Sequence, residues 1–344
     1  MRALILHGPD DLRLQQVPRP EPGAGEIVVA IDAALTCATD AKALVRGGHP
    51  SLGPLPAAFG HEGTGIVAAT GAGVSGVAVG DAVAVANSAP CGSCEWCRAG
   101  REGLCSGITY LSGTYAEYLL VPASIVAVNV VPRPAGLVAS LAALAEPVAC
   151  GVRAAERSSA RPGDSVVVLG GGLQGQVIGM ALARRGCEVV LCDPHPDRRE
   201  LALRMGVQRV ADAPRDAAGI ARVRELTPGG LGAHATVAAV GAVGVWEAAA
   251  ALTRAGGEVN FHGGPAPDAV LGIPAARLHY QEITLQASYH HTPGTFRRAL
   301  AMIDADRDLF GALIGPEIGL EQVAAALAAH GPKRIVRPEP YGDG

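Results

Sequence analysis

The chain of 344 residues is long enough to bury a large core, and its length suits two domains better than one. Hydrophobic residues make up 49% and charged residues 17%, which is typical of an ordered globular protein and excludes a disordered one. The net charge of −4 gives no reason to expect nucleic acid or an anionic membrane as a partner. No apolar run is long enough to span a bilayer.

The amino terminus opens on MRALILHGP, a strand-like segment without the basic stretch, apolar stretch and cleavage site of a secretory signal. We therefore expect a cytoplasmic protein. Thiols stay reduced in that compartment, so clustered cysteines there favour a metal site over disulfides.

The first 130 residues are rich in predicted β-strands. Short alternating or apolar runs predict strands at 26–32, 64–70, 81–85 and 116–121. Gly and Pro separate these runs at irregular intervals, as in EPGAGE and GAGVSGVAVGD. The pattern predicts an irregular, mainly antiparallel β domain with few helices.

The middle of the chain changes to a regular alternation of strands and helices. Strands are predicted at 165–170, 188–193, 208–211, 235–241, 257–264 and 283–289, and helices up to about 186 and at 196–206, 215–226 and 243–254. Continuous apolar strands in such an alternation are typical of a parallel sheet in a doubly wound α/β domain.

The C-terminal part carries predicted helices near 293–305 and 320–329 and a last strand, KRIVR. We expect this tail to return to the first domain. The predicted organisation is therefore a β domain built from residues 1–150 and 290–344, and a doubly wound domain over 151–289.

The turn after the first middle strand reads GGGLQG, in which Gly170, Gly172 and Gly175 have the spacing G-x-G-x-x-G. Glycine allows a tight turn, a close approach of the backbone to a pyrophosphate and close helix–strand packing. Leu173 and Gln174 complete the loop, and the following helix N-terminus suits a phosphate. Glycine-rich turns of this spacing also arise by chance among 46 glycines, so the motif alone is weak.

Asp193 strengthens the prediction because it ends the next strand, 18 residues after Gly175. An acid there accepts the ribose hydroxyls of a dinucleotide and repels a 2′-phosphate, which favours NAD over NADP. Arg198 and Arg199 lie close by in the sequence and are suited to hold that phosphate, so NADP remains the alternative. Both arginines also fit an ordinary solvated helix start.

Four of the eight cysteines cluster in the stretch PCGSCEWCRAGREGLC, at Cys91, Cys94, Cys97 and Cys105. Four thiolates allow tetrahedral coordination with a closed shell, which suits a structural zinc ion that cannot bind substrate. A thioredoxin-like redox pair would need only one dithiol. An iron–sulfur cluster is the alternative, and it would colour the protein brown.

Three separated segments, LTCATDAK, FGHEGTG and LAEPVAC, carry a second set of metal-ligand types. Cys37, His61, Glu62 and Glu146 offer a thiolate, an imidazole and two carboxylates, all suited to zinc. Each residue also has an ordinary structural explanation, as a small core residue, a loop histidine, a surface charge or a helix-end acid. Spacing along the sequence does not show that the four converge.

Together these motifs resemble those of the zinc-dependent medium-chain dehydrogenase/reductases, the alcohol dehydrogenase family, across essentially the whole chain. The resemblance rests on C-x-T-D at 37–40, G-H-E at 60–62, the cysteine cluster, E-P at 146–147, and GGGLQG with Asp193. It implies a GroES-like catalytic domain carrying both zinc sites, beside a Rossmann cofactor domain. Glu146 is most similar to the third ligand of the polyol (sorbitol/iditol) and threonine dehydrogenase branches.

The resemblance also implies residue roles. Cys37, His61 and Glu146 would hold a catalytic zinc, with Glu62 as a further ligand or as a neighbouring acid. Thr39 would take the substrate proton into a relay, and Asp40 would orient His61. Many relatives have His where this chain has Lys42, whose role stays open, as does that of Tyr289, His290 and His291.

We therefore expect an enzyme with one catalytic and one structural zinc ion that transfers a hydride between a secondary alcohol and NAD to give a ketone. The expected substrate is a small polyol, sugar or cyclitol. An amino alcohol such as L-threonine or an aminocyclitol is the alternative, and a non-catalytic zinc-stabilised NAD-binding protein is the rival from another class. By resemblance we expect a homodimer or homotetramer.

Overall fold

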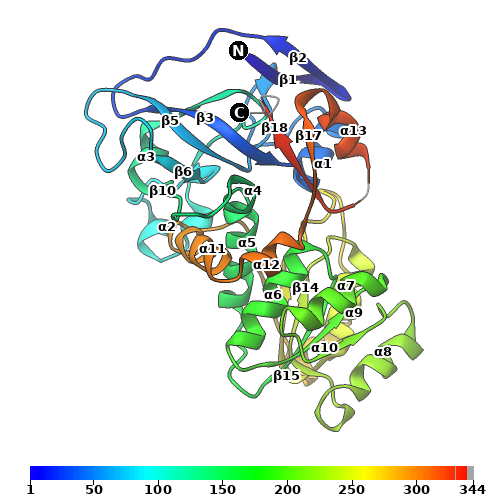
Figure 1. Ribbon diagram of the computed structural model, residues 1–344. Coiled ribbons are helices and arrows are strands. Elements are labelled where there is room, and N and C mark those ends of the chain that lie inside the picture. Colours follow the sequence, from blue (N-terminus) through cyan, green and yellow to red (C-terminus); the bar gives the residue numbers. More distant parts are fainter. Residues whose placement is uncertain (330, 339–344) are drawn as a thin grey trace. The chain divides into compact units, whose positions relative to one another are not determined.

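The computed structural model describes residues 1–329 and 331–338. The chain divides into two compact units (Figure 1). Unit 1 combines Met1–Ala149 with the C-terminal segment from His291, and unit 2 is Cys150–His290. The described helices include none that is long and apolar enough to cross a membrane.

Unit 1 is built mainly from short strands. Its strands are β1 (Arg2–Gly8), β2 (Asp11–Gln16), β3 (Ile27–Leu35), β4 (Ala57–Ala58), β5 (Gly63–Thr70), β6 (Ala82–Val85), β7 (Ser88–Ala89), β8 (Thr109–Tyr110), β9 (Tyr118–Val121), β10 (Val130–Pro132), β17 (Ile314–Gly319) and β18 (Lys333–Arg337). Its helical segments are α1 (Ala38–Arg46), α2 (Glu95–Arg98), η1 (Glu102–Leu104), α3 (Ala123–Asn129), α4 (Ala139–Ala142), α11 (Pro293–Ala305), α12 (Arg307–Gly311), η3 (Leu320–Gln322) and α13 (Val323–Ala328). Helix α5 (Ala145–Arg157) begins in unit 1 and continues into unit 2.

Strand β3 organises unit 1. It pairs antiparallel with β5, β9 and β18 in a seven-stranded sheet of order β10-β6-β5-β3-β18-β17, with β9 off that path. The pairing of Ile335 with Leu35 brings the tail strand beside the end of β3, as the red and blue ribbons show in Figure 1. The tail strand thus lies in the sheet of unit 1, and it puts Lys333 next to the segment that leads into α1.

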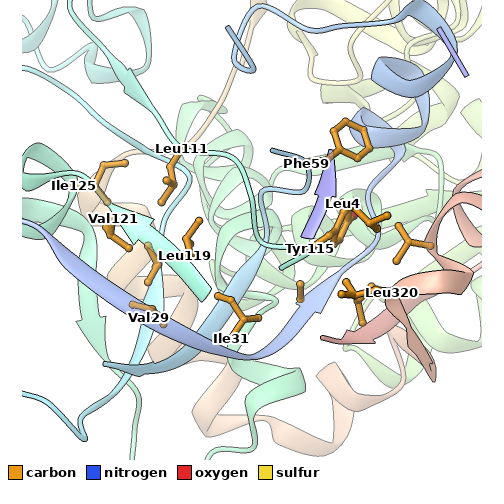
Figure 2. Close-up of a cluster of buried hydrophobic side chains, with 14 of the residues drawn as sticks. Leu4, Val29, Ile31, Phe59, Leu111, Tyr115, Leu119, Val121, Ile125 and Leu320 are labelled. Carbon is orange, nitrogen blue, oxygen red and sulfur yellow. The ribbon is translucent and has the colours of Figure 1, made fainter. Parts of the chain in front are cut away.

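The core of unit 1 follows from alternating side chains. Val29 and Ile31 on β3 face Leu119 and Val121 from β9 in one buried cluster (Figure 2). Tyr115, just before β9, is fully buried in the same cluster. The irregular, mainly antiparallel β domain is confirmed, although β17 and β18 pair in parallel.

Unit 2 is a doubly wound domain, as predicted. Its elements are β11 (Ser165–Leu169), α6 (Leu173–Arg184), β12 (Glu188–Cys192), α7 (Pro196–Arg204), β13 (Arg209–Ala211), α8 (Ala217–Glu225), η2 (Pro228–Gly230), β14 (Ala233–Ala238), α9 (Val243–Leu252), β15 (Thr253–Phe261), α10 (Ala275–Tyr280) and β16 (Thr284–Ala287). All six strands are parallel in the order β13-β12-β11-β14-β15-β16, which is the arrangement of a dinucleotide-binding sheet.

The continuous apolar run of β11 is explained by burial on both faces. Val166 and Val168 pack into one core cluster with α6, whereas Val167 and Leu169 pack into another with α9. A strand covered on both sides needs apolar residues at every position.

Several elements were missed by the sequence prediction, and two of them show the physical reason clearly. Strand β2 pairs only with β1 and is half exposed and polar, so it carries little apolar periodicity. Helix α10 has six residues and no buried side chain, so it lacks an apolar face. The helix predicted at 320–329 begins as the 3₁₀ turn η3 before α13.

Candidate functional site

Cys37 lies at the start of helix α1, where β3 ends. It is the N-cap residue, and its sulfur accepts a hydrogen bond from the backbone N–H of Thr39 at 3.4 Å. A helix N-terminus leaves backbone N–H groups without partners inside the helix. The fold therefore places Cys37 where its sulfur is suited to a metal ion.

His61 is oriented by Asp40 from the first turn of the same helix. The Nδ1 atom of His61 lies 2.8 Å from Oδ1 of Asp40, and the Asp40 side chain is buried. Burial would lower the pKa of His61, but the charges of Asp40 and Cys37 raise it well above its ordinary value. When the Nδ1–H of His61 donates to Asp40, Nε2 is the ring atom that remains available to a metal. Orienting His61 in this way is the role that the resemblance implies for Asp40.

Glu62 is fully buried and forms an ion pair with Lys333 from β18. The Nζ atom of Lys333 lies 2.5 and 2.6 Å from the two carboxylate oxygens and donates a further hydrogen bond to the Thr36 carbonyl at 2.9 Å. Burial alone would lower the pKa of Lys333, but the nearby negative charges of Cys37 and Glu62 raise it well above its ordinary value. Lys333 therefore stays charged and neutralises Glu62.

The ligand atoms of Cys37, His61 and Glu62 lie within 4.8 Å of one another. Glu146 does not belong to this group. Its carboxylate is buried at the start of α5 and accepts a hydrogen bond from Asn87 Nδ2 at 3.0 Å. The Oδ1 atom of Asn87 in turn lies 2.8 Å from Nε2 of His291. The negative charge of Glu146 nevertheless acts on Lys333, so Glu146 is a neighbour of the group.

The donor set fits a zinc ion. A thiolate and an imidazole are preferred zinc ligands, and Glu62 and Glu146 offer carboxylates nearby. Glu62 is paired with Lys333, whereas the Glu146 carboxylate accepts its hydrogen bond from Asn87.

The four-cysteine cluster is a separate site around α2 and η1. The sulfur atoms of Cys91, Cys94, Cys97 and Cys105 all lie within 4.8 Å of one another. The distances of 3.5 and 3.8 Å from Cys94 to Cys97 and Cys105 suit joint coordination of one metal ion and are too long for disulfides. Hydrogen bonds from the backbone at Cys97 and Ser106 lower the pKa of Cys94 to about 5, whereas burial and the neighbouring thiols raise that of Cys97 to about 12. A cation is needed for all four to be thiolates together.

The glycine-rich loop of unit 2 connects β11 to α6 as predicted. A Cβ atom on Gly175 would lie 1.7 Å from the carbonyl oxygen of Gly170, so the helix start requires glycine there. A Cβ atom on Gly172, the N-cap residue of α6, would meet open space. This open side of the helix N-terminus is suited to a phosphate group.

Asp193 follows β12 and is buried beside this loop. Its carboxylate accepts hydrogen bonds from the backbone N–H groups of Gly171 at 2.7 Å and His195 at 2.8 Å. Arg198 Nη1 lies 3.6 Å from the same carboxylate, whereas Arg199 donates to the Asp193 carbonyl at 2.6 Å. A carboxylate retains acceptor sites after two such bonds, so Asp193 is still suited to bind a ribose.

Gln174 and His262 are linked at the carboxyl edge of the same sheet. Nε2 of His262, just after β15, lies 3.0 Å from Gln174 Oε1, and its Nδ1 lies 3.0 Å from Ser288 Oγ. Burial lowers the pKa of His262 to about 4, so its ring is neutral at pH 7. Gln176 donates to the carbonyls of Gly171 and Arg198 and fixes the loop to α7.

Comparisons with known proteins agree with both units. Residues 23–133 match the model of the alcohol dehydrogenase GroES-like domain, and residues 174–305 match that of the zinc-binding dehydrogenases. Alcohol dehydrogenase 1 of Emericella nidulans is 32% identical over 287 residues, which are 80% of this chain and 79% of that protein. The chain belongs to the zinc-dependent medium-chain dehydrogenase/reductases. It is therefore an oxidoreductase of the alcohol dehydrogenase type.

Two further members of this family are informative. L-galactonate-5-dehydrogenase of Escherichia coli is 30% identical over 303 residues, covering 87% of this chain and 86% of that protein. A solved structure from Sinorhizobium meliloti, described as a zinc-binding dehydrogenase bound to NADP, is 26% identical with a TM-score of 0.86 and covers 98% of this chain and 99% of that chain. The predicted resemblance and fold class are confirmed, whereas the choice between NAD and NADP is not decided by these relatives.

Several residues of the site were missed by the sequence analysis. Lys333, Asn87, Tyr115 and His262 lie far along the chain from the motifs that they contact, so spacing gives no signal for them. Of these four residues, Lys333 alone had a usable signal in the sequence, because the chain has only two lysines. The exposed Lys42 lies on α1, and Tyr289 is exposed and stacks on His290.

We expect replacement of Lys333 by Met to destabilise the protein, because it leaves the buried Glu62 carboxylate without its cation. Loss of one partner of a buried pair costs about 3–5 kcal/mol. The unfolding midpoint in a thermal or urea titration should therefore fall clearly for Lys333→Met and much less for Lys333→Arg. Equal stability of the two variants would contradict a structural role for this pair.

The cysteine cluster gives a second prediction. Cys94→Ser should lower the zinc content by one ion per chain and lower the melting temperature, because three thiolates no longer close the tetrahedral shell. Plasma emission spectrometry and thermal scanning measure both. Cys187→Ser is the control, since Cys187 is buried in unit 2, outside the cluster. A brown protein with iron in place of zinc would contradict this assignment.

Proposed function

We propose that this chain is a zinc- and NAD-dependent dehydrogenase that oxidises a secondary alcohol of a polyol, sugar or cyclitol reversibly to a ketone. The observation that carries the proposal is the convergence of Cys37 and His61 from separate segments, with Asp40 holding the distal nitrogen of His61. We assign Cys37, His61 and Glu146 as the ligands of the catalytic zinc. The four-cysteine cluster is assigned to a structural zinc.

The residues of the site have distinct tasks. A zinc ion bound there supplies a Lewis acid for the substrate hydroxyl, and a bound nicotinamide accepts the hydride. Asp40 keeps the proton of His61 on Nδ1. The partly exposed Thr39, in the turn after Cys37, would accept the substrate hydroxyl proton on its Oγ1 and pass its own hydroxyl proton to water. Lys333 keeps Glu62 engaged in an ion pair.

The substrate class follows from the carboxylate in the ligand set and from one relative. L-galactonate-5-dehydrogenase is named for a polyhydroxy acid, and its similarity covers 87% of this chain. An amino alcohol remains the alternative substrate, because an L-threonine 3-dehydrogenase is 31% identical over 224 residues. A panel of polyols, sugar acids, cyclitols and amino alcohols, read as NADH formation, separates the two.

The assignment of NAD rests on Asp193, whose charge at the end of β12 repels a 2′-phosphate. Arg198 is already 3.6 Å from that carboxylate. The ion pair with Asp193 therefore engages Arg198, the arginine that would otherwise bind the 2′-phosphate of NADP.

We expect His61→Ala to remove one zinc ion per chain and to lower turnover by more than about 100-fold, beyond the loss usual for an outer partner of a metal ligand. The circular dichroism spectrum should not change. His7→Ala is the matched control, because His7 lies on β1 and contacts Gln15. Full activity of the His61 variant would refute the zinc mechanism.

Asp193→Asn should weaken NAD use and favour NADP. Losing hydrogen bonds donated to a charged acceptor costs about 1.5–3 kcal/mol, which corresponds to roughly 10- to 150-fold in kcat/KM for NAD. Asp212→Asn is the control, since Asp212 is largely exposed and lies 3.7 Å from Arg199. A wild-type enzyme that prefers NADP would overturn the assignment.

A further inference from the structure

Tyr115 is joined to the proposed metal ligand His61 by a short chain of hydrogen bonds. The Tyr115 hydroxyl lies 2.6 Å from Asp40 Oδ2, and Asp40 Oδ1 lies 2.8 Å from His61 Nδ1. The Tyr115 hydroxyl also lies 3.0 Å from the carbonyl oxygen of Leu35. The shorter bond to a charged acceptor is the stronger one, so the hydroxyl proton belongs to Asp40.

The position of Tyr115 is fixed by its backbone as well. Its N–H donates to the Phe59 carbonyl at 3.0 Å, and its carbonyl accepts from Leu4 at 2.9 Å. Phe59 comes two residues before His61, so these bonds fasten Tyr115 to the loop that carries the ligand. Figure 2 shows Tyr115 beside Leu4 within the core cluster.

The ring of Tyr115 packs directly on that loop. A Cβ atom on Gly60 would lie 2.7 Å from Tyr115 Cγ, and Gly60 has a φ of 89°. Only glycine fits between the ring and the loop at this backbone angle. The ring therefore defines the path of the backbone immediately before His61.

The hydroxyl has a task that the ring does not have. Asp40 and Tyr115 are both buried, and a buried carboxylate must be hydrogen-bonded to remain charged. Burial and the charge of Asp40 raise the pKa of Tyr115 well above its ordinary value, so the hydroxyl keeps its proton and remains a donor. A donor on one carboxylate oxygen holds the other oxygen in the plane and direction of His61 Nδ1.

We propose that Tyr115 is a positioning residue for the metal ligand His61, acting through Asp40 by the hydrogen bond from its hydroxyl. The inference deepens the proposed function, since it rests on His61 as a zinc ligand. The inference assigns to Tyr115, a residue of the core, an effect on metal retention that the packing of its ring alone would not give.

The test compares Tyr115→Phe with the wild-type holoenzyme. Phe keeps the ring and its packing but removes the donor. In Tyr115→Phe, we expect a chelator to remove the zinc ion at His61 about tenfold faster than in the wild type, which is the lower end of what outer partners of ligands contribute. This is the ion that His61→Ala should lack. The cobalt-substituted enzyme should show a changed visible spectrum for the same site. The zinc of the cysteine cluster should be lost at the wild-type rate.

Tyr118→Phe is the matched control. It makes the same chemical change three residues away, where the Tyr118 ring stacks under Arg19 at 3.9 Å. Its zinc loss should equal that of the wild type. Zinc retention by Tyr115→Phe at the wild-type rate would overturn the proposal.

Asp40→Ala provides a second test, because it removes both acceptors of the chain of hydrogen bonds and leaves Tyr115 intact. It should loosen the same zinc ion at least as much as Tyr115→Phe does, and adding Tyr115→Phe to it should change nothing further. Additive effects of the two substitutions would overturn the action through Asp40. If His61→Ala retains both zinc ions, the proposed function fails. If it loses one while Tyr115→Phe and Asp40→Ala lose none faster, only this inference fails.

Discussion

Unit 1 buries negative charge, and the compensation of that charge determines how its site is built. Asp40, Glu62 and Glu146 are all buried, and the charges of Glu62 and Glu146 act on Lys333 together with that of Cys37. Isolated buried charges are too costly to persist, so each must have a cation or a set of donors. Lys333 compensates Glu62, while His61 and Tyr115 bind Asp40. In the proposed function, a divalent cation held by Cys37, His61 and Glu146 completes this compensation.

This compensation depends on the sheet topology. Lys333 reaches Glu62 because β18, which follows unit 2 along the chain, pairs with β3 of unit 1. Tyr115 reaches Asp40 because its backbone is bonded to Phe59 and Leu4. Residues separated by 75 and 271 positions in sequence thus act on one site. Both contacts belong to the described part of unit 1 and need no partner from unit 2.

Local patterns were enough to predict much of the fold. The continuous apolar strands of unit 2 indicate burial on both faces of the sheet. The short-range spacing of the GGGLQG turn and Asp193 predicts a dinucleotide site. The four-cysteine cluster is equally local. The contacts of Lys333 with Glu62 and of Tyr115 with Asp40 could not be predicted, because long-range strand pairing brings these residues together and leaves no periodic signal. The resemblance named the candidate ligands Cys37, His61 and Glu146, but it did not give the hydrogen bond from Asn87 that engages Glu146.

The central claim is that the protein holds a metal ion at Cys37 and His61 as well as one in the cysteine cluster. A crystal structure with anomalous diffraction data at the zinc absorption edge tests it most directly. The account predicts two anomalous peaks per chain, one among the four cysteine sulfur atoms and one bonded to Cys37 Sγ, His61 Nε2 and the carboxylate of Glu146. A zinc-loaded crystal whose only peak lies in the cysteine cluster would contradict it.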